Sequence, residues 1–106
     1  MQFRGGMNEL MRQAARMQRK IEQAKTELKD REHTLEGLGG KVKVTVTLGR
    51  AVKRIEIDKE TLKTEDTDLV LDGVCAALTQ AIEQADKQME VELDKITGGV
   101  KIPGMT

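Results

Sequence analysis

Four basic side chains near the start of the chain are spaced so that they fall on one side of an α-helix. They are Arg12, Arg16, Arg19 and Lys20, and they lie within an arc of about 100° at 3.6 residues per turn. We call these four residues the basic stripe. Guanidinium and ammonium groups attract phosphates, and arginine also binds them through paired hydrogen bonds. The chemistry that the spacing favours is therefore the binding of a polyanion, with a solvated helix face as the alternative.

The distribution of charge along the chain supports this interpretation. The formal net charge is zero, yet residues 1–20 carry five bases and one acid, and residues 41–54 carry five bases and no acid. Residues 55–94 carry three bases and twelve acids. A basic front joined to an acidic back is typical of a protein with an anionic partner. Outside the basic stripe, we predict that the residues contacting this partner are Arg4, Lys41 and Lys43, and Arg50, Lys53 and Arg54 are secondary candidates.

Other site chemistries lack the residues that they need. Gly40-Lys41 is followed by Val42 and a predicted strand, whereas a P-loop requires Ser or Thr and then a helix. His33 and Cys75 are the only residues of their types, too few for a metal centre or a catalytic pair. We expect Cys75 to be a small core residue. We therefore expect no enzyme activity, cofactor, metal or small-molecule substrate, although a pocket with converging polar groups would reopen the question.

The aromatic content narrows the choice of polyanion. Phe3 is the only aromatic residue, whereas proteins that read single strands stack bases on aromatic rings. No apolar run approaches the ~20 residues of a membrane span, and the first ten residues do not resemble a signal peptide. A lone cysteine is typical of a reducing cytoplasm. Duplex DNA gripped through its phosphates, in the cytoplasm, is the partner that these features favour.

Apolar spacing predicts a long helix over residues 7–30. Its apolar residues recur every three or four positions, as in a coiled coil: Met7, Leu10, Ala14, Met17, Ile21, Ala24 and Leu28. We call this set the seam. A seam that narrow favours packing along one partner helix, and with so few aromatic residues for a core it predicts a homodimer. The alternative is an amphipathic helix that lies on the sheet of its own chain.

The middle of the chain predicts a small antiparallel sheet. Residues 33–36 form a short strand, and residues 41–48 alternate valine with polar residues. Gly49-Arg50 is a tight turn into a third strand with a bulge near Lys53. A second long helix is expected over residues 68–96, after a polar segment with one helical turn at 59–62. Its predicted apolar face is Leu71, Cys75, Leu78, Ile82, Ala85 and Met89.

Three segments of the sequence resemble the YbaB/EbfC nucleoid-associated proteins. They are GGMNELMRQAARMQ at residues 5–18, GLGGKVKVTVTLG followed by IEID at residues 55–58, and KIPGM at residues 101–105. Together they extend over nearly the whole chain, which we interpret as one domain, residues 1–106, with a flexible tail at 97–106. The resemblance implies an α+β fold of helix, three strands and helix that forms a tweezer-like homodimer in the bacterial cytoplasm.

The resemblance also implies a function. It implies binding of duplex DNA with little sequence specificity, and a role in nucleoid organisation and gene expression. Its first helix contains the basic stripe, so the expectation from the residues and the one from the resemblance coincide. A coiled-coil homodimer that binds other proteins and no nucleic acid stays open as the alternative.

Overall fold

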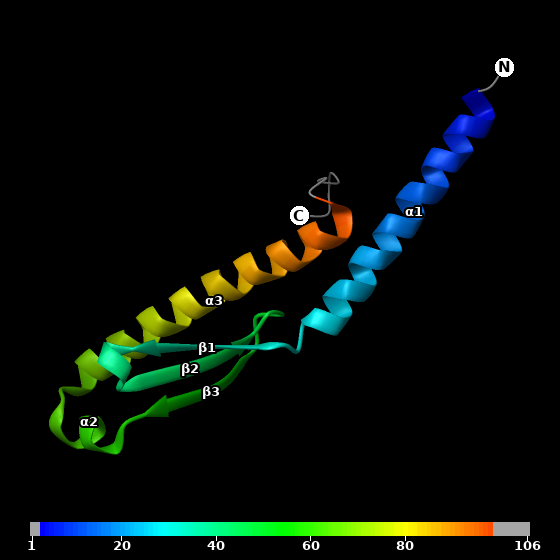
Figure 1. The fold of residues 1–106 in the computed structure, drawn as a ribbon. Helices are drawn as coiled ribbons and strands as arrows, with labels where there is room; N and C mark the ends of the chain where they lie inside the picture. The colour runs from blue at the N-terminus through cyan, green and yellow to red at the C-terminus, as the bar shows by residue number, and fades with distance from the viewer. Residues whose placement is uncertain (1–2, 99–106) are drawn as a thin grey trace.

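The structure is a computed structural model that describes the backbone of residues 3–98 and the side chains of residues 6–98. A long helix, a three-stranded sheet and a second long helix follow one another, with two short helices between them (Figure 1). The elements are α1 Phe3–Leu28, β1 Glu32–Gly37, the 3₁₀ helix η1 Leu38–Gly40, β2 Val42–Thr47, β3 Val52–Ile57, α2 Lys59–Thr64 and α3 Thr67–Thr97. The predicted α+β fold is confirmed. Most of the predicted tail, residues 99–106, lies outside the described residues.

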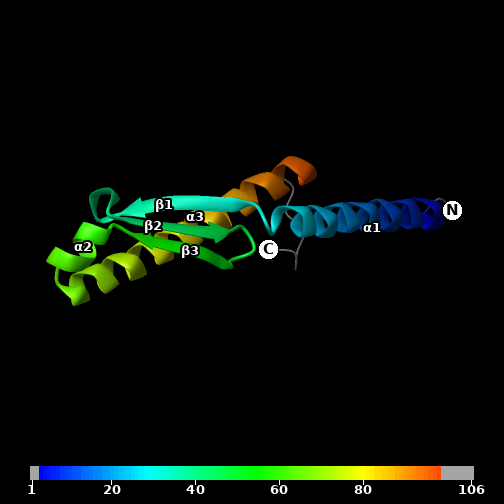
Figure 2. The same ribbon diagram turned by 90° about the horizontal axis from the view of Figure 1, so that it is seen from below.

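Helix α1 divides into a packed half and a projecting half. Ile21, Ala24 and Leu28 are buried, whereas Met7 and Leu10 are exposed. Ala24 and Leu28 form a cluster with Leu48, and three residues of α3 pack against it: Met89, Leu93 and Ile96. Half of the seam therefore has its partner helix within the same chain. The other half extends beyond the rest of the fold (Figures 1 and 2), which accounts for a long dimension of 77 Å.

The sheet is antiparallel in the order β1-β2-β3. Val42, Val44 and Val46 of the central strand are fully buried against α3, as the alternation predicts. Thr45 pairs with Arg54 and Val46 with Val52, so Lys53 is the extra residue of a bulge, as expected. Arg50, which has a φ of 73°, turns β2 into β3.

Helix α3 lies diagonally over one face of the sheet (Figure 1). Its buried residues are Val70, Val74, Ala77, Ala81 and Ala85. The prediction that Leu71 and Cys75 belong to the core is wrong, because both are exposed. The physical reason is the face that α3 turns toward the sheet. Its buried residues recur every three or four positions, and Leu71 and Cys75 each follow one of them by a single position, so both lie about 100° further around the helix, on its flank.

The end of α1 and the tip of the β2–β3 hairpin are tied together. The Gly49 amide donates to the Lys29 carbonyl at 2.9 Å, and the Leu48 amide donates to the Arg31 carbonyl at 2.9 Å. A Cβ at Gly49 would lie 2.9 Å from both the Cβ and the carbonyl oxygen of Lys29. Glycine is therefore required for this close approach. We call this junction the corner.

Candidate functional site

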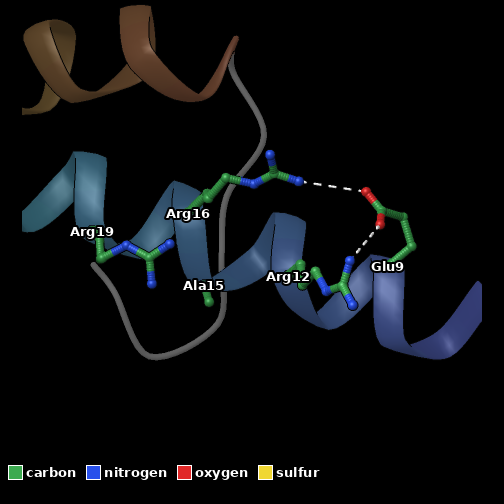
Figure 3. A pocket seen from close by; sticks show the side chains of 5 residues that line it. All are labelled: Glu9, Arg12, Ala15, Arg16 and Arg19. Carbon is green, nitrogen blue, oxygen red and sulfur yellow. Dashed lines mark hydrogen bonds and ion pairs between the residues drawn. The ribbon is translucent and has the colours of Figure 1, made fainter.

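The basic stripe lies on the projecting half of α1. The helix brings Arg12 and Arg16 to one carboxylate, that of Glu9 (Figure 3). Arg12 Nη1 lies 3.8 Å from Glu9 Oε2, and Arg16 Nη2 donates to Glu9 Oε1 at 3.4 Å. All three side chains are more than half exposed, so water screens both ion pairs. The two guanidinium groups remain accessible to a competing anion.

Arg19 extends the same surface toward the packed half of α1. Together with Glu9, Arg12, Ala15 and Arg16, it lines an open hollow of about 480 Å³ (Figure 3). Arg19 and Lys20 are exposed and form no ion pair among the described residues. Three arginines around an open hollow can bind phosphate oxygens, and no general acid or base stands out among them.

The other predicted contact residues lie elsewhere. Lys41 and Lys43 are at the start of β2, at the end of the sheet that is remote from α1 (Figures 1 and 2). Lys41 Nζ donates to Glu65 Oε1 at 3.4 Å, and Lys43 stands between Glu36 and Glu56 in the strand register. The structure therefore does not join these lysines to the basic stripe. Arg4 belongs to α1, but its side chain lies outside the described residues.

The basic residues of the hairpin are also engaged within the chain. Arg50 Nε lies 3.6 Å from Asp86 Oδ1, and Arg54 Nη2 lies 3.6 Å from Glu32 Oε1. The two backbone hydrogen bonds of the corner hold the hairpin tip against the end of α1, whereas surface turns are usually among the more mobile parts of a protein. Of the basic surfaces in the described structure, the basic stripe is the one that projects from the fold.

An ion-pair cluster holds α3 beside the corner. Arg31 Nη1 donates to Glu92 Oε1 at 3.1 Å, and Lys95 Nζ donates to the same oxygen at 3.3 Å. These hydrogen bonds hold the pKa of the Glu92 carboxyl below its ordinary value, with that from Arg31 as the largest cause. The cluster therefore fixes the base of the helix that carries the basic stripe.

The described residues contain no group of three or more His, Cys, Asp or Glu side chains that could hold a metal ion. No helix in the described part of the chain is long and apolar enough to cross a membrane.

Sequence reasoning missed the role of Glu9. The residue lies three positions before Arg12 and seven before Arg16, which is a spacing that places all three on neighbouring turns of a helix. Helical spacing was therefore sufficient to identify Glu9 as the acid within the basic surface.

Comparisons with known proteins identify the family and the fold of the chain. The model of the YbaB/EbfC DNA-binding family matches residues 3–100. A nucleoid-associated protein of Acetivibrio thermocellus is 36% identical over 97% of this chain and 92% of its own length. Another, of Agathobacter rectalis, is 38% identical over 91% of this chain and 85% of its own. The crystal structure of the uncharacterized protein HP0035 from Helicobacter pylori shares the fold, with a TM-score of 0.71 at 20% identity, and the match covers 86% of this chain and 96% of that one.

Proposed function

This chain belongs to the YbaB/EbfC DNA-binding family, and from that premise we propose that it binds duplex DNA through the basic stripe with little sequence specificity. The observation that carries the proposal is the geometry of α1. The stripe spans about 12 Å along the helix axis, close to the ~12 Å width of the major groove. One helix can thus follow phosphates along a groove edge. Contacts to phosphates carry no direct sequence information, which is why we expect little specificity.

We also propose that the protein is a homodimer. Val52 and Ile55 of the edge strand β3 are 48% and 45% exposed, and Leu71 on the flank of α3 is 55% exposed. Val52 and Ile55 pair with buried valines of β2, so they lie on the helix side of the sheet where α3 leaves it uncovered. Burying this apolar surface in a second copy is favourable. Two copies would present two basic stripes to one duplex.

The salt dependence of binding tests the phosphate mechanism. If each stripe makes two to four phosphate contacts, a dimer should give a log–log slope of about −4 to −7. Fluorescence anisotropy with several unrelated duplexes, at five or more salt concentrations, measures the slope and the specificity together. Light scattering on the protein without DNA should give about twice the chain mass of 11.8 kDa.

A pair of double variants tests the location. Arg12→Glu, Arg16→Glu should remain folded and dimeric, lose most of the affinity, and show a flatter slope. Lys59→Glu, Lys63→Glu in α2 is the matched control, because it reverses the same charge at exposed positions remote from the stripe (Figure 1). Equal losses from both pairs would show that net charge matters and the stripe does not. Wild-type binding by the stripe variant would refute the proposal.

We further propose that the protein acts in the cytoplasm at the nucleoid, where it organises DNA and influences gene expression. The names of the relatives support the nucleoid location. A fluorescent fusion should overlap with stained DNA in the cell, and the stripe variant should be diffuse. We assign it no catalytic role, cofactor, membrane partner or small-molecule substrate. A folded dimer that binds no duplex at low salt would instead favour the coiled-coil interaction protein.

A further inference from the structure

The exposed half of the seam is an apolar surface that the described part of the chain leaves uncovered. Ile21 is 3% exposed, but Met7, Leu10 and Met11 on the projecting half are 58%, 62% and 65% exposed. On its own, the projecting half of α1 would be only marginally stable as a helix in water. The seam residues of the projecting half lie away from the basic stripe, so a segment that covers them would leave the arginines free.

Helix α3 ends close to the buried part of the seam, next to which the exposed apolar surface begins. Ile96 packs against the cluster of Ala24 and Leu28, and α3 ends at Gly98, whose left-handed backbone stops the helix. The end of α3 lies beside α1, whose first half extends past it (Figures 1 and 2). The residues that follow Gly98 therefore leave from a point close to the last buried turns of α1.

The length and composition of the following segment match the surface. Residues 99–106, GVKIPGMT, can extend over about 26 Å, and the rise from Met7 to Ile21 is about 21 Å. Four of these eight residues are apolar: Val100, Ile102, Pro103 and Met105. Pro103 fixes its own φ near −65° and disfavours helical backbone at the preceding Ile102, which lowers the entropy cost of docking.

We propose that residues 99–106 dock on the exposed half of the seam of their own chain. The apolar side chains of the segment cover the seam from Met17 toward Met7, and the segment supports the projecting half of α1. The second possible occupant is another copy of the chain. The same chain is the favoured occupant. Its segment is joined to Gly98 beside α1, so it is present at the seam at a high effective concentration.

Disulfide trapping without DNA tests this proposal independently of the proposed function. In a Cys75→Ser background, Ala14→Cys is combined with Ile102→Cys, because about 13 Å of extended chain from Gly98 brings residue 102 near Ala14. Ala15→Cys with Ile102→Cys is the matched control, because residue 15 lies about 100° further around α1 and lines the hollow beside the arginines. In a dilute thiol–disulfide buffer, the Ala14 pair should form its disulfide at least about tenfold faster than the Ala15 pair. In a mixture of isotopically light and heavy protein, each disulfide of the Ala14 pair should join residues of one chain. Equal rates, or mixed light–heavy disulfides, would overturn the proposal.

Hydrogen exchange provides a second measurement that does not depend on disulfide geometry. In the full chain, Val100→Asp, Ile102→Asp should increase amide exchange over residues 6–17 and leave β2 unchanged, because charged side chains cannot cover an apolar face. Lys101→Asp is the control, since it places the charge at an already polar position. Unchanged exchange over residues 6–17 in the double variant would count against docking.

Discussion

In the proposed mechanism, the Glu9 carboxylate competes with DNA for the arginines of the basic stripe, so its removal should strengthen binding. In the free protein its carboxylate is 3.8 Å from Arg12 and 3.4 Å from Arg16. A phosphate that takes these guanidinium groups must displace the carboxylate and then tolerate its negative charge nearby. Exposed ion pairs of this kind are worth about 0.2–1 kcal/mol each. Glu9→Gln keeps the size of the side chain and removes both pairs.

The two pairs together contribute about 0.4–2 kcal/mol, so the expected gain is about two- to thirtyfold in affinity per stripe at low salt, because 1.4 kcal/mol corresponds to a factor of ten. The gain should shrink as salt is added, since the competing pairs are screened as well. Anisotropy titrations at two salt concentrations measure it. Glu60→Gln is the control: it makes the same change of charge in α2, at the opposite end of the molecule. If Glu9→Gln binds no tighter than Glu60→Gln, Glu9 does not restrain the stripe.

Three further predictions concern stability. The hydrogen bonds from Arg31 and Lys95 lower the pKa of Glu92, so its contribution is present above about pH 4.5 and is lost as the pH falls through the lowered pKa. Glu92→Gln should therefore unfold more easily than wild type at neutral pH, and the difference should disappear once the pH is below the lowered pKa, as followed by urea denaturation; a constant difference would contradict this. Ala81→Leu overfills the contact of α3 with the sheet, where Ala81 is fully buried, and should cost about 1–3 kcal/mol of unfolding free energy, while an unchanged urea midpoint would mean that α3 can move away. Gly49→Ala forces apart the hairpin tip and the end of α1 and should lower the thermal midpoint, and a wild-type midpoint would show that the corner is compliant.

Local patterns in the sequence were sufficient for the elements of the fold. The alternation in residues 41–48 predicts β2, and the mismatch of Val52 with Ile55 and Ile57 predicts the bulge at Lys53, because strand periodicity is a property of neighbouring residues. The start of α1 was expected at Met7, but the helix begins at Phe3. Gly5 and Gly6 suggested a helix boundary, and the structure shows them within the helix.

What the sequence could not predict depends on contacts between distant residues. The apolar arc of α3 is wide enough for two faces, and the close approach of Ala77 and Ala81 to β2 selects one of them. Cys75 is exposed for that reason. In the candidate site, helical spacing alone placed the basic stripe on one surface. The separation of Lys41 and Lys43 from that surface depends on the direction in which β2 runs, which only the fold establishes.

Helix α1 is a lever that is anchored along its last third. The helix has 26 residues, and its anchors are the buried residues Ile21, Ala24 and Leu28 together with the corner. The part before them, residues 3–20, is about 26 Å long, so a rotation of about 10° at the anchored end would move its tip by about 4.5 Å, a little less than the rise of one helical turn. Small rearrangements at the anchored end would thus be magnified at the tip, and in the proposed dimer two such arms would adjust to straight or bent DNA without any change in the sheet.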